Sequence, residues 1–120
     1  MPKLVVEITH APYGRENAYA GLFIAMAWVS VGHEVIVALH SDGVYAAKKG
    51  QLDPMKEISL PSVEKQITDI IGEGGRVIAD RTCVEVRGLD EETMVKGVEV
   101  LDSDDLVKLV FEEGERVLTL

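Results

Sequence analysis

The run Glu34-Val-Ile-Val-Ala-Leu39 limits most strongly what this chain can fold into. Its residues are mostly apolar, and apolar and polar side chains do not alternate along it. A strand with one face in water alternates, whereas a parallel strand that is covered on both faces does not. The run therefore predicts a buried strand of a parallel sheet.

Four further strand-like segments are spread along the chain and alternate with helical patterns. They span residues 3–9, 76–79, 98–101 and 116–120. Strands that alternate with helices are typical of a parallel sheet with right-handed crossovers and helices on both faces. We therefore expect an α/β fold with three layers, α/β/α, around a mostly parallel sheet of about five strands.

The first long helix is expected between Arg15 and Val31, where apolar residues are nearly continuous and Gly32 follows as a typical stop. A surface helix has one polar face, but this one has almost none. We therefore expect more than the sheet to cover it, and a subunit interface is the expected second cover.

The remaining helices are expected to be amphipathic or short. Serine and aspartate are favoured at helix N-caps, and glycine is common just after helix ends. On these signals we expect a helix at residues 62–71 capped by Ser62, one at 41–49 capped by Ser41 or Asp42, one helical turn before Gly88, a short helix at 90–96, and one capped by Ser103 that ends at Gly114, with a loop at residues 51–61.

Size and charge exclude several classes of protein. A chain of 120 residues is the usual size of one domain, so we expect a single domain over residues 1–120. Its 12 basic and 21 acidic residues give a net charge of −9, which repels a phosphate backbone and argues against direct binding of nucleic acid. One cysteine forms no intramolecular disulfide or multi-cysteine metal site, and no leader or membrane segment is recognisable. We expect a cytoplasmic protein without metal or cofactor.

Three residues that could carry chemistry follow the ends of predicted strands. In parallel sheets, ligands bind outside the carboxyl ends of the strands, and the loops with His10, His40 and Cys83 are expected there. A thiolate is the strongest side-chain nucleophile at neutral pH, and a helix N-terminus or the guanidinium of Arg81 or Arg87 would favour it. Asp80 and Glu85 would disfavour it. The other interpretation of Cys83 is a small buried apolar residue.

The other residues of this edge are open to two interpretations. His10 and His40 are candidates for a general base or for positioning a ligand, although loop histidines are mostly structural. Tyr13 and Tyr45 either line a pocket or pack against neighbours. The turn at residues 11–14 lacks the glycine pattern of a phosphate loop, which argues against a nucleotide-binding domain.

Four motifs in chain order carry a resemblance to a known family. They are Ala11-Pro-Tyr-Gly14, Ser41-Asp-Gly-Val44, Thr82-Cys83 with Arg87-Gly88, and the terminal Arg116-Val-Leu-Thr-Leu120. Together the motifs cover essentially the whole chain, and they are more specific in combination than any one of them alone. The chain resembles the DsrE/DsrF-like sulfur-relay family, including its TusD-like and YchN-like members.

The resemblance implies a DsrE-like domain that forms trimers or hexamers and carries sulfur as a persulfide on a cysteine in the loop after the third strand. It also implies protein donors and acceptors of sulfur, and a pocket holding His10, Tyr13, Ser41 and Asp42. Relatives often have a Cys-x-x-Cys-like pattern whose first position matches the sulfur-carrying cysteine of the TusD-like branch. Asp80 occupies that position here, and Cys83 occupies the second.

Two functions therefore stay open. In the first, the chain is a sulfurtransferase of the persulfide-carrier type, with Cys83 three residues, or one helical turn, after the usual position. In the second, it is a noncatalytic scaffold or small-ligand-binding subunit of a DsrE-type homo- or hetero-oligomer. The absence of a cysteine at Asp80 favours the second.

Overall fold

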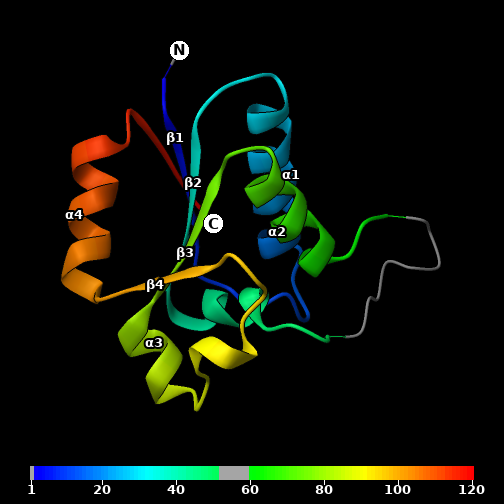
Figure 1. Ribbon diagram of the computed structural model, residues 1–120, viewed down its shortest axis with the longest axis vertical. Helices are drawn as coiled ribbons and strands as arrows, with labels where there is room; N and C mark the ends of the chain where they lie inside the picture. Colours follow the sequence, from blue (N-terminus) through cyan, green and yellow to red (C-terminus); the bar gives the residue numbers. More distant parts are fainter. Residues whose placement is uncertain (1, 52–59) are drawn as a thin grey trace.

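The computed structural model describes residues 2–51 and 60–120, and its centre is a five-stranded sheet in the order β4-β3-β2-β1-β5 (Figure 1). Every pair of neighbouring strands is parallel, so the predicted parallel sheet is confirmed. The strands are β1 (Leu4–Ile8), β2 (Val35–Leu39), β3 (Arg76–Asp80), β4 (Glu99–Leu101) and β5 (Arg116–Thr119).

Helices cover both faces of this sheet, which gives the expected three layers. The helices α1 (Asn17–Ser30) and α2 (Val63–Gly72) lie on one face, and α4 (Ser103–Glu113) lies on the other (Figure 1). All five residues of β2 are buried, because side chains of this strand contribute to the core on both sides. The absence of alternation in its sequence follows directly from this double cover.

Alternate residues of each central strand belong to two separate apolar clusters. The larger cluster joins strand residues to α1 and α2, and the smaller one joins the other strand residues to α4. This is the two-residue period of a strand, applied to two buried faces. The buried strand residues are Val6, Ile8, Val35, Val37, Leu39, Val77 and Ala79 in the larger cluster, and Val5, Ile36, Ala38 and Ile78 in the smaller one.

The second cover expected for α1 is only partly present within the chain. Helix α2 packs beside α1, and Leu22 and Ala25 of α1 are fully buried. Phe23 and Ile24, on the same helix, are 60% and 39% exposed. The nearly uniform apolar character of α1 therefore leaves two large side chains facing solvent.

The predicted caps have different outcomes. Ser62 is confirmed, because its hydroxyl oxygen accepts a hydrogen bond from the Lys65 N–H at 3.0 Å. A short helix is present after β2, as the 3-10 helix η1 (Ser41–Ala47), but the predicted cap at Ser41 or Asp42 is wrong, because η1 follows His40 and no side chain caps it. The predicted cap of α4 is wrong as well. Ser103 is the first residue of α4, after Asp102, and its side chain does not cap the helix.

The two short helices expected after β3 are both present, one of them reduced, and one predicted loop lies mostly outside the described residues. The single turn before Gly88 is the helix α3 (Arg81–Val86), and the helix expected at residues 90–96 is reduced to a 3-10 turn, η3 (Glu91–Thr93). Most of the loop predicted at residues 51–61 falls on residues 52–59, outside the described residues. Among the helices that the structure describes, none is long and apolar enough to cross a membrane.

Candidate active site around Cys83

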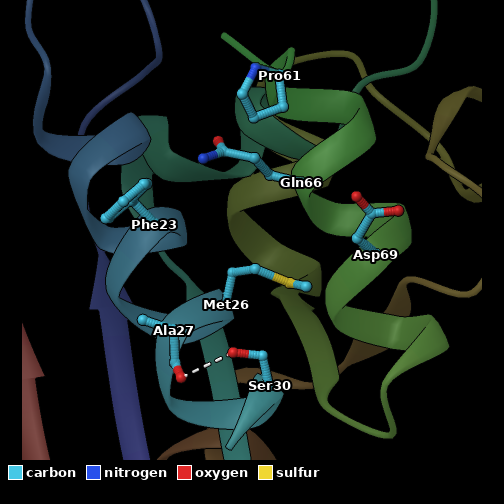
Figure 2. A pocket seen from close by; sticks show the side chains of 7 residues that line it. All are labelled: Phe23, Met26, Ala27, Ser30, Pro61, Gln66 and Asp69. Atoms are coloured by element: carbon cyan, nitrogen blue, oxygen red, sulfur yellow. Dashed lines mark hydrogen bonds between the residues drawn. The ribbon is translucent and has the colours of Figure 1, made fainter.

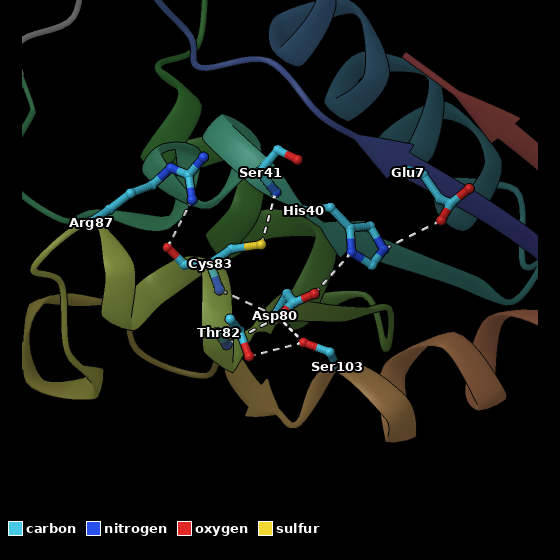
Figure 3. A network of polar contacts seen from close by, with 8 residues as sticks. All are labelled: Glu7, His40, Ser41, Asp80, Thr82, Cys83, Arg87 and Ser103. Atoms are coloured by element: carbon cyan, nitrogen blue, oxygen red, sulfur yellow. Dashed lines mark hydrogen bonds and ion pairs between the residues drawn. The ribbon is translucent and has the colours of Figure 1, made fainter.

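Polar side chains meet at the carboxyl edge of the sheet, at the ends of β1, β2 and β3 (Figure 3). Helix α3 begins directly after β3, and η1 begins two residues after the end of β2. Because the strands are parallel, both of these short helices lie at the same edge. This edge brings Cys83 of α3 against Ser41 of η1.

Cys83 is a free cysteine, partly exposed, in the first turn of α3. Its Sγ accepts a hydrogen bond from the backbone N–H of Ser41, with 3.2 Å between nitrogen and sulfur. Ser41 has a φ of 52°, in the left-handed region that non-glycine residues rarely adopt. The turn after β2 therefore holds a main-chain donor toward the thiol in an uncommon backbone conformation.

Asp80 ends β3 and caps α3. Its Oδ1 accepts hydrogen bonds from the N–H groups of Thr82 and Cys83 at 3.0 and 3.4 Å, and from the Ser103 hydroxyl at 2.6 Å. Burial raises the pKa of this carboxyl group, but the hydrogen bonds from Ser103, Cys83 and His40 outweigh burial, and the pKa lies below its ordinary value. Asp80 is therefore a buried, ionised carboxylate at neutral pH.

The imidazole of His40 lies between two carboxylates. Its Nδ1 is 3.3 Å from Oδ2 of Asp80, and its Nε2 is 3.3 Å from Oε2 of Glu7 (Figure 3). Glu7 in turn accepts a hydrogen bond from the Thr119 hydroxyl at 2.9 Å. Three side chains, from β1, from the turn before η1 and from β3, thus form one row across the edge of the sheet.

Sequence reasoning did not single out Glu7 or Ser103 as part of this site. A signal existed for Glu7, since it is the one charged residue within the apolar strand Leu4–Ile8. Ser103 looked like an ordinary helix cap, and its hydroxyl instead donates to Asp80 across the chain. Only the tertiary structure reveals that direction.

The two arginines expected near the thiol bind carboxylates. Arg81 donates to Asp102 at 2.8 Å and to Glu91 at 3.2 Å, which raises its pKa above the ordinary value for arginine. The guanidinium group of Arg87 donates to Asp42 at 2.9 Å and to the Cys83 carbonyl oxygen at 3.1 Å. Arg87 and Asp42 therefore tie the beginning of η1 to the thiol-bearing helix.

Two other residues expected in the pocket have different neighbours. Tyr13 is 57% exposed, its hydroxyl donates to Gln51, and its ring centroid lies 6.5 Å from that of Tyr45. Burial raises the pKa of Tyr13, and Tyr45 adds to the shift. His10 follows β1, and its Nδ1 lies 3.4 Å from the Thr9 hydroxyl. Among the described residues, no hydrogen bond or ring contact joins either one to Cys83.

A hollow of about 200 Å³ lies between α1 and α2 (Figure 2). Its walls are mostly apolar, and the buried Gln66 side chain has an Oε1 without a hydrogen-bond partner. None of its lining residues belongs to the Cys83 site. They are Phe23, Met26, Ala27, Ser30, Pro61, Gln66 and Asp69.

The Cys83 site is suited to thiol chemistry. Within the described part of the chain, no group of three or more histidine, cysteine or acidic residues is arranged to hold a metal ion. The site offers instead a partly exposed thiol, a backbone N–H at its sulfur, and a buried carboxylate that holds the thiol-bearing helix. A hydrogen bond donated to sulfur favours its anionic, nucleophilic form.

Comparisons with known proteins agree with this architecture. A sequence model of the DsrE/DsrF-like family matches residues 3–120. An uncharacterised protein of Methanopyrus kandleri is 38% identical over 115 residues, which cover 96% of this chain and 91% of that protein.

Two further relatives bear on the fold and the family. The intracellular sulfur oxidation protein DsrF of Allochromatium vinosum is 29% identical over 106 residues, covering 88% of this chain and 68% of DsrF. The crystal structure of the ychN protein from E. coli has the same fold, with a TM-score of 0.87, 24% identity and full coverage of both chains. From the match over nearly its whole length, this chain belongs to the DsrE/DsrF-like family.

Proposed function

We propose that this protein is a sulfur carrier in which Cys83 holds sulfane sulfur as a persulfide and passes it to a thiol on a partner protein. The observation that carries the proposal is the hydrogen bond from the Ser41 N–H to the Sγ of a partly exposed, free cysteine. Membership of the DsrE/DsrF-like family and the similarity to DsrF, a protein named for sulfur oxidation, support it.

The proposed loading step is a thiol exchange. The Cys83 thiolate attacks the outer sulfur of a donor persulfide, R–S–SH, so that a new S–S bond forms at Cys83 while the bond to the donor's inner sulfur breaks. The donor leaves as the thiolate R–S⁻, and Cys83 becomes Cys83–S–SH. The donor is thereby reduced and Cys83 is oxidised, so no further oxidant is needed. Transfer to the acceptor repeats the exchange in the opposite sense.

The proposal includes assembly with other chains. Phe23 and Ile24 of α1 are apolar and exposed, and we propose that they form part of a contact between copies in a trimer or hexamer. Donor and acceptor would be further proteins whose cysteines reach the carboxyl edge of the sheet. We place this relay in the cytoplasm, where free thiols are kept reduced.

A noncatalytic role as scaffold or small-ligand-binding subunit is the second candidate. It is favoured by Asp80, which stands where the resemblance places the sulfur-carrying cysteine and which is buried and hydrogen-bonded as a helix cap. The hollow between α1 and α2 would be the place for a small ligand. In that case Cys83 would have no chemical role.

Mass spectrometry of the intact protein after incubation with polysulfide separates the two candidates. Sulfur carriage predicts that the wild type gains the mass of one or more sulfur atoms, that a reductant removes the gain, and that Cys83→Ala shows none. Cys83→Ser is the matched control, because it keeps the size and a hydrogen-bond acceptor while removing the thiol. A wild type that gains no sulfur, with a thiol that resists alkylation, would leave the scaffold role.

A further inference from the structure

His40 is connected to Cys83 in two ways, through its side chain and through its backbone. The side chain reaches Asp80, whose carboxylate accepts the Cys83 N–H. The backbone continues into Ser41, whose N–H donates to the Cys83 Sγ. His40 is therefore linked to two of the hydrogen bonds of Cys83, the one at its N–H and the one at its sulfur (Figure 3).

We propose that His40 is a positioning residue for Cys83: its ring holds Asp80, which caps the thiol-bearing helix, and its backbone holds the Ser41 N–H against the sulfur, where that donor favours the reactive thiolate. His40 touches neither the sulfur nor the donor persulfide in this proposal. It acts through Asp80, which its side chain contacts, and through Ser41, which follows it in the chain. The inference rests on the proposed role of Cys83 and adds a residue that determines how reactive that thiol is.

The side-chain connection depends on which atoms can donate. A carboxylate only accepts hydrogen bonds, so Nδ1 supplies the proton in the hydrogen bond with Asp80. Nδ1 is hydrogen-bonded to Asp80, while Nε2 is buried and forms no hydrogen bond, with the Glu7 carboxylate at ion-pair distance. Glu7 thus backs the ring from the side of β1 and keeps Nδ1 directed at Asp80.

The backbone connection is held rigidly against β1. The His40 N–H donates to the Ile8 carbonyl oxygen at 3.0 Å, and the His40 carbonyl oxygen accepts from the Gly43 N–H at 2.8 Å. A Cβ at Gly43 would come within 2.0 Å of the same Ile8 oxygen, so this turn lies against the strand without room to move. A strained residue such as Ser41 persists only where its surroundings fix it, and these contacts provide that restraint.

Three substitutions at His40 separate the two carboxylate contacts. In His40→Asn, the amide nitrogen takes the place of Nδ1 and keeps a donor for Asp80. In His40→Gln, it takes the place of Nε2 and faces Glu7 instead. His40→Ala removes both ring nitrogens. His33→Asn is the control, since His33 precedes β2 at the opposite edge of the sheet, where its ring packs on Trp28.

The measurement is the rate of Cys83 alkylation at neutral pH divided by the rate at a pH high enough to ionise the thiol. This ratio reports the thiolate fraction, and a change in accessibility alone affects both rates equally. We expect His40→Ala and His40→Gln to lower the ratio by about threefold to tenfold, the effect of one hydrogen bond, with His40→Asn and His33→Asn close to wild type. Circular dichroism establishes that each variant is folded.

Two results would overturn the inference. One is a wild-type ratio in His40→Gln, because the donor toward Asp80 would then be irrelevant to the thiol. The other is an equal loss in the Asn and Gln variants, because the bond to Asp80 would then not be the connection that matters. If His40→Ala does not fold, the alkylation ratios of His40→Asn and His40→Gln still test the positioning role.

Sulfur loading of the same variants distinguishes a failure of the positioning role of His40 from a failure of the proposed carrier function of Cys83. If the wild type takes no sulfur from polysulfide but the alkylation ratios follow the expected order, the carrier role fails and the positioning role stands. If all variants load sulfur and share one alkylation ratio, the carrier role stands and the positioning role fails.

Discussion

The Ser103 hydroxyl donates a hydrogen bond to the Asp80 carboxylate, with 2.6 Å between the two oxygens. Ser103 begins α4 and Asp80 ends β3, so this contact joins the helix on one face of the sheet to the edge that carries Cys83. Because the acceptor is charged, the bond stabilises more than a bond between neutral groups.

Removing that hydroxyl should therefore be more costly than removing an ordinary helix cap. We expect Ser103→Ala to lower the free energy of unfolding by about 1.5–3 kcal/mol, as for a hydrogen bond to a charged group. The matched control is Ser62→Ala, which removes the cap of α2 and should cost about 1 kcal/mol. Urea unfolding of both variants is the measurement, and a smaller loss for Ser103→Ala than for Ser62→Ala would contradict the prediction.

The buried carboxylate of Asp80 should make the free energy of unfolding depend on pH in the acid range. Its pKa in the folded protein lies below the unfolded value of about 3.9, so its contribution is complete above that pH and is lost as the pH falls through the folded pKa. We expect Asp80→Asn to be less stable than wild type at neutral pH, with a shallower loss of stability below about pH 4. The measurement is the free energy of unfolding of both proteins, from urea unfolding at a series of acid pH values. Equal slopes against pH for the two proteins would contradict the prediction.

Gly43 should tolerate no side chain. Its Cβ would lie 2.0 Å from the Ile8 carbonyl oxygen, and the backbone of β1 cannot move away without disturbing the centre of the sheet. We expect Gly43→Ala to cost at least about 2–3 kcal/mol.

The control for Gly43 is Gly72→Ala at the end of α2. Nothing lies within 4 Å of a Cβ there, and alanine has the higher helix propensity. Gly72→Ala should leave the thermal midpoint unchanged or raise it, whereas Gly43→Ala should lower it clearly. Equal midpoints for the two variants would show that the turn after β2 is looser than its contacts indicate.

Self-association should depend on α1 and not on α4. Phe23 of α1 is 60% exposed and Phe111 of α4 is 76% exposed, so an aspartate at either position leaves the core intact. We expect Phe23→Asp to reduce the molar mass measured by light scattering toward that of one chain, with Phe111→Asp unchanged from wild type. A wild type that is already a single chain, or dissociation caused by Phe111→Asp, would refute an interface on α1.

Much of this fold was accessible from sequence, because burial on two faces leaves a strong pattern. The apolar run that ends at Leu39 predicted a buried parallel strand, and β2 is that strand. The caps were less accessible, since the sequence shows a hydroxyl near a helix start but not its direction. Ser62 bonds within its own helix, whereas Ser103 bonds to Asp80, which precedes it by 23 residues.

The candidate site was predictable to the same extent. The positions of His40 and Cys83 after parallel strands placed them at one edge, because strand direction alone decides this. The row from Glu7 through His40 to Asp80 was not predictable, since it depends on the order of strands within the sheet. The contact of Tyr13 with Gln51 likewise depends on how two distant loops meet.

The first turn of α3 also gives residues 80 and 83 of this chain different surroundings. A thiol is a weak acceptor, so a cysteine there would leave the amide groups of Thr82 and Cys83 poorly matched. Asp80 is only 6% exposed, whereas Cys83 is partly open to solvent. One helical turn separates a position that serves the architecture from one that another molecule can touch.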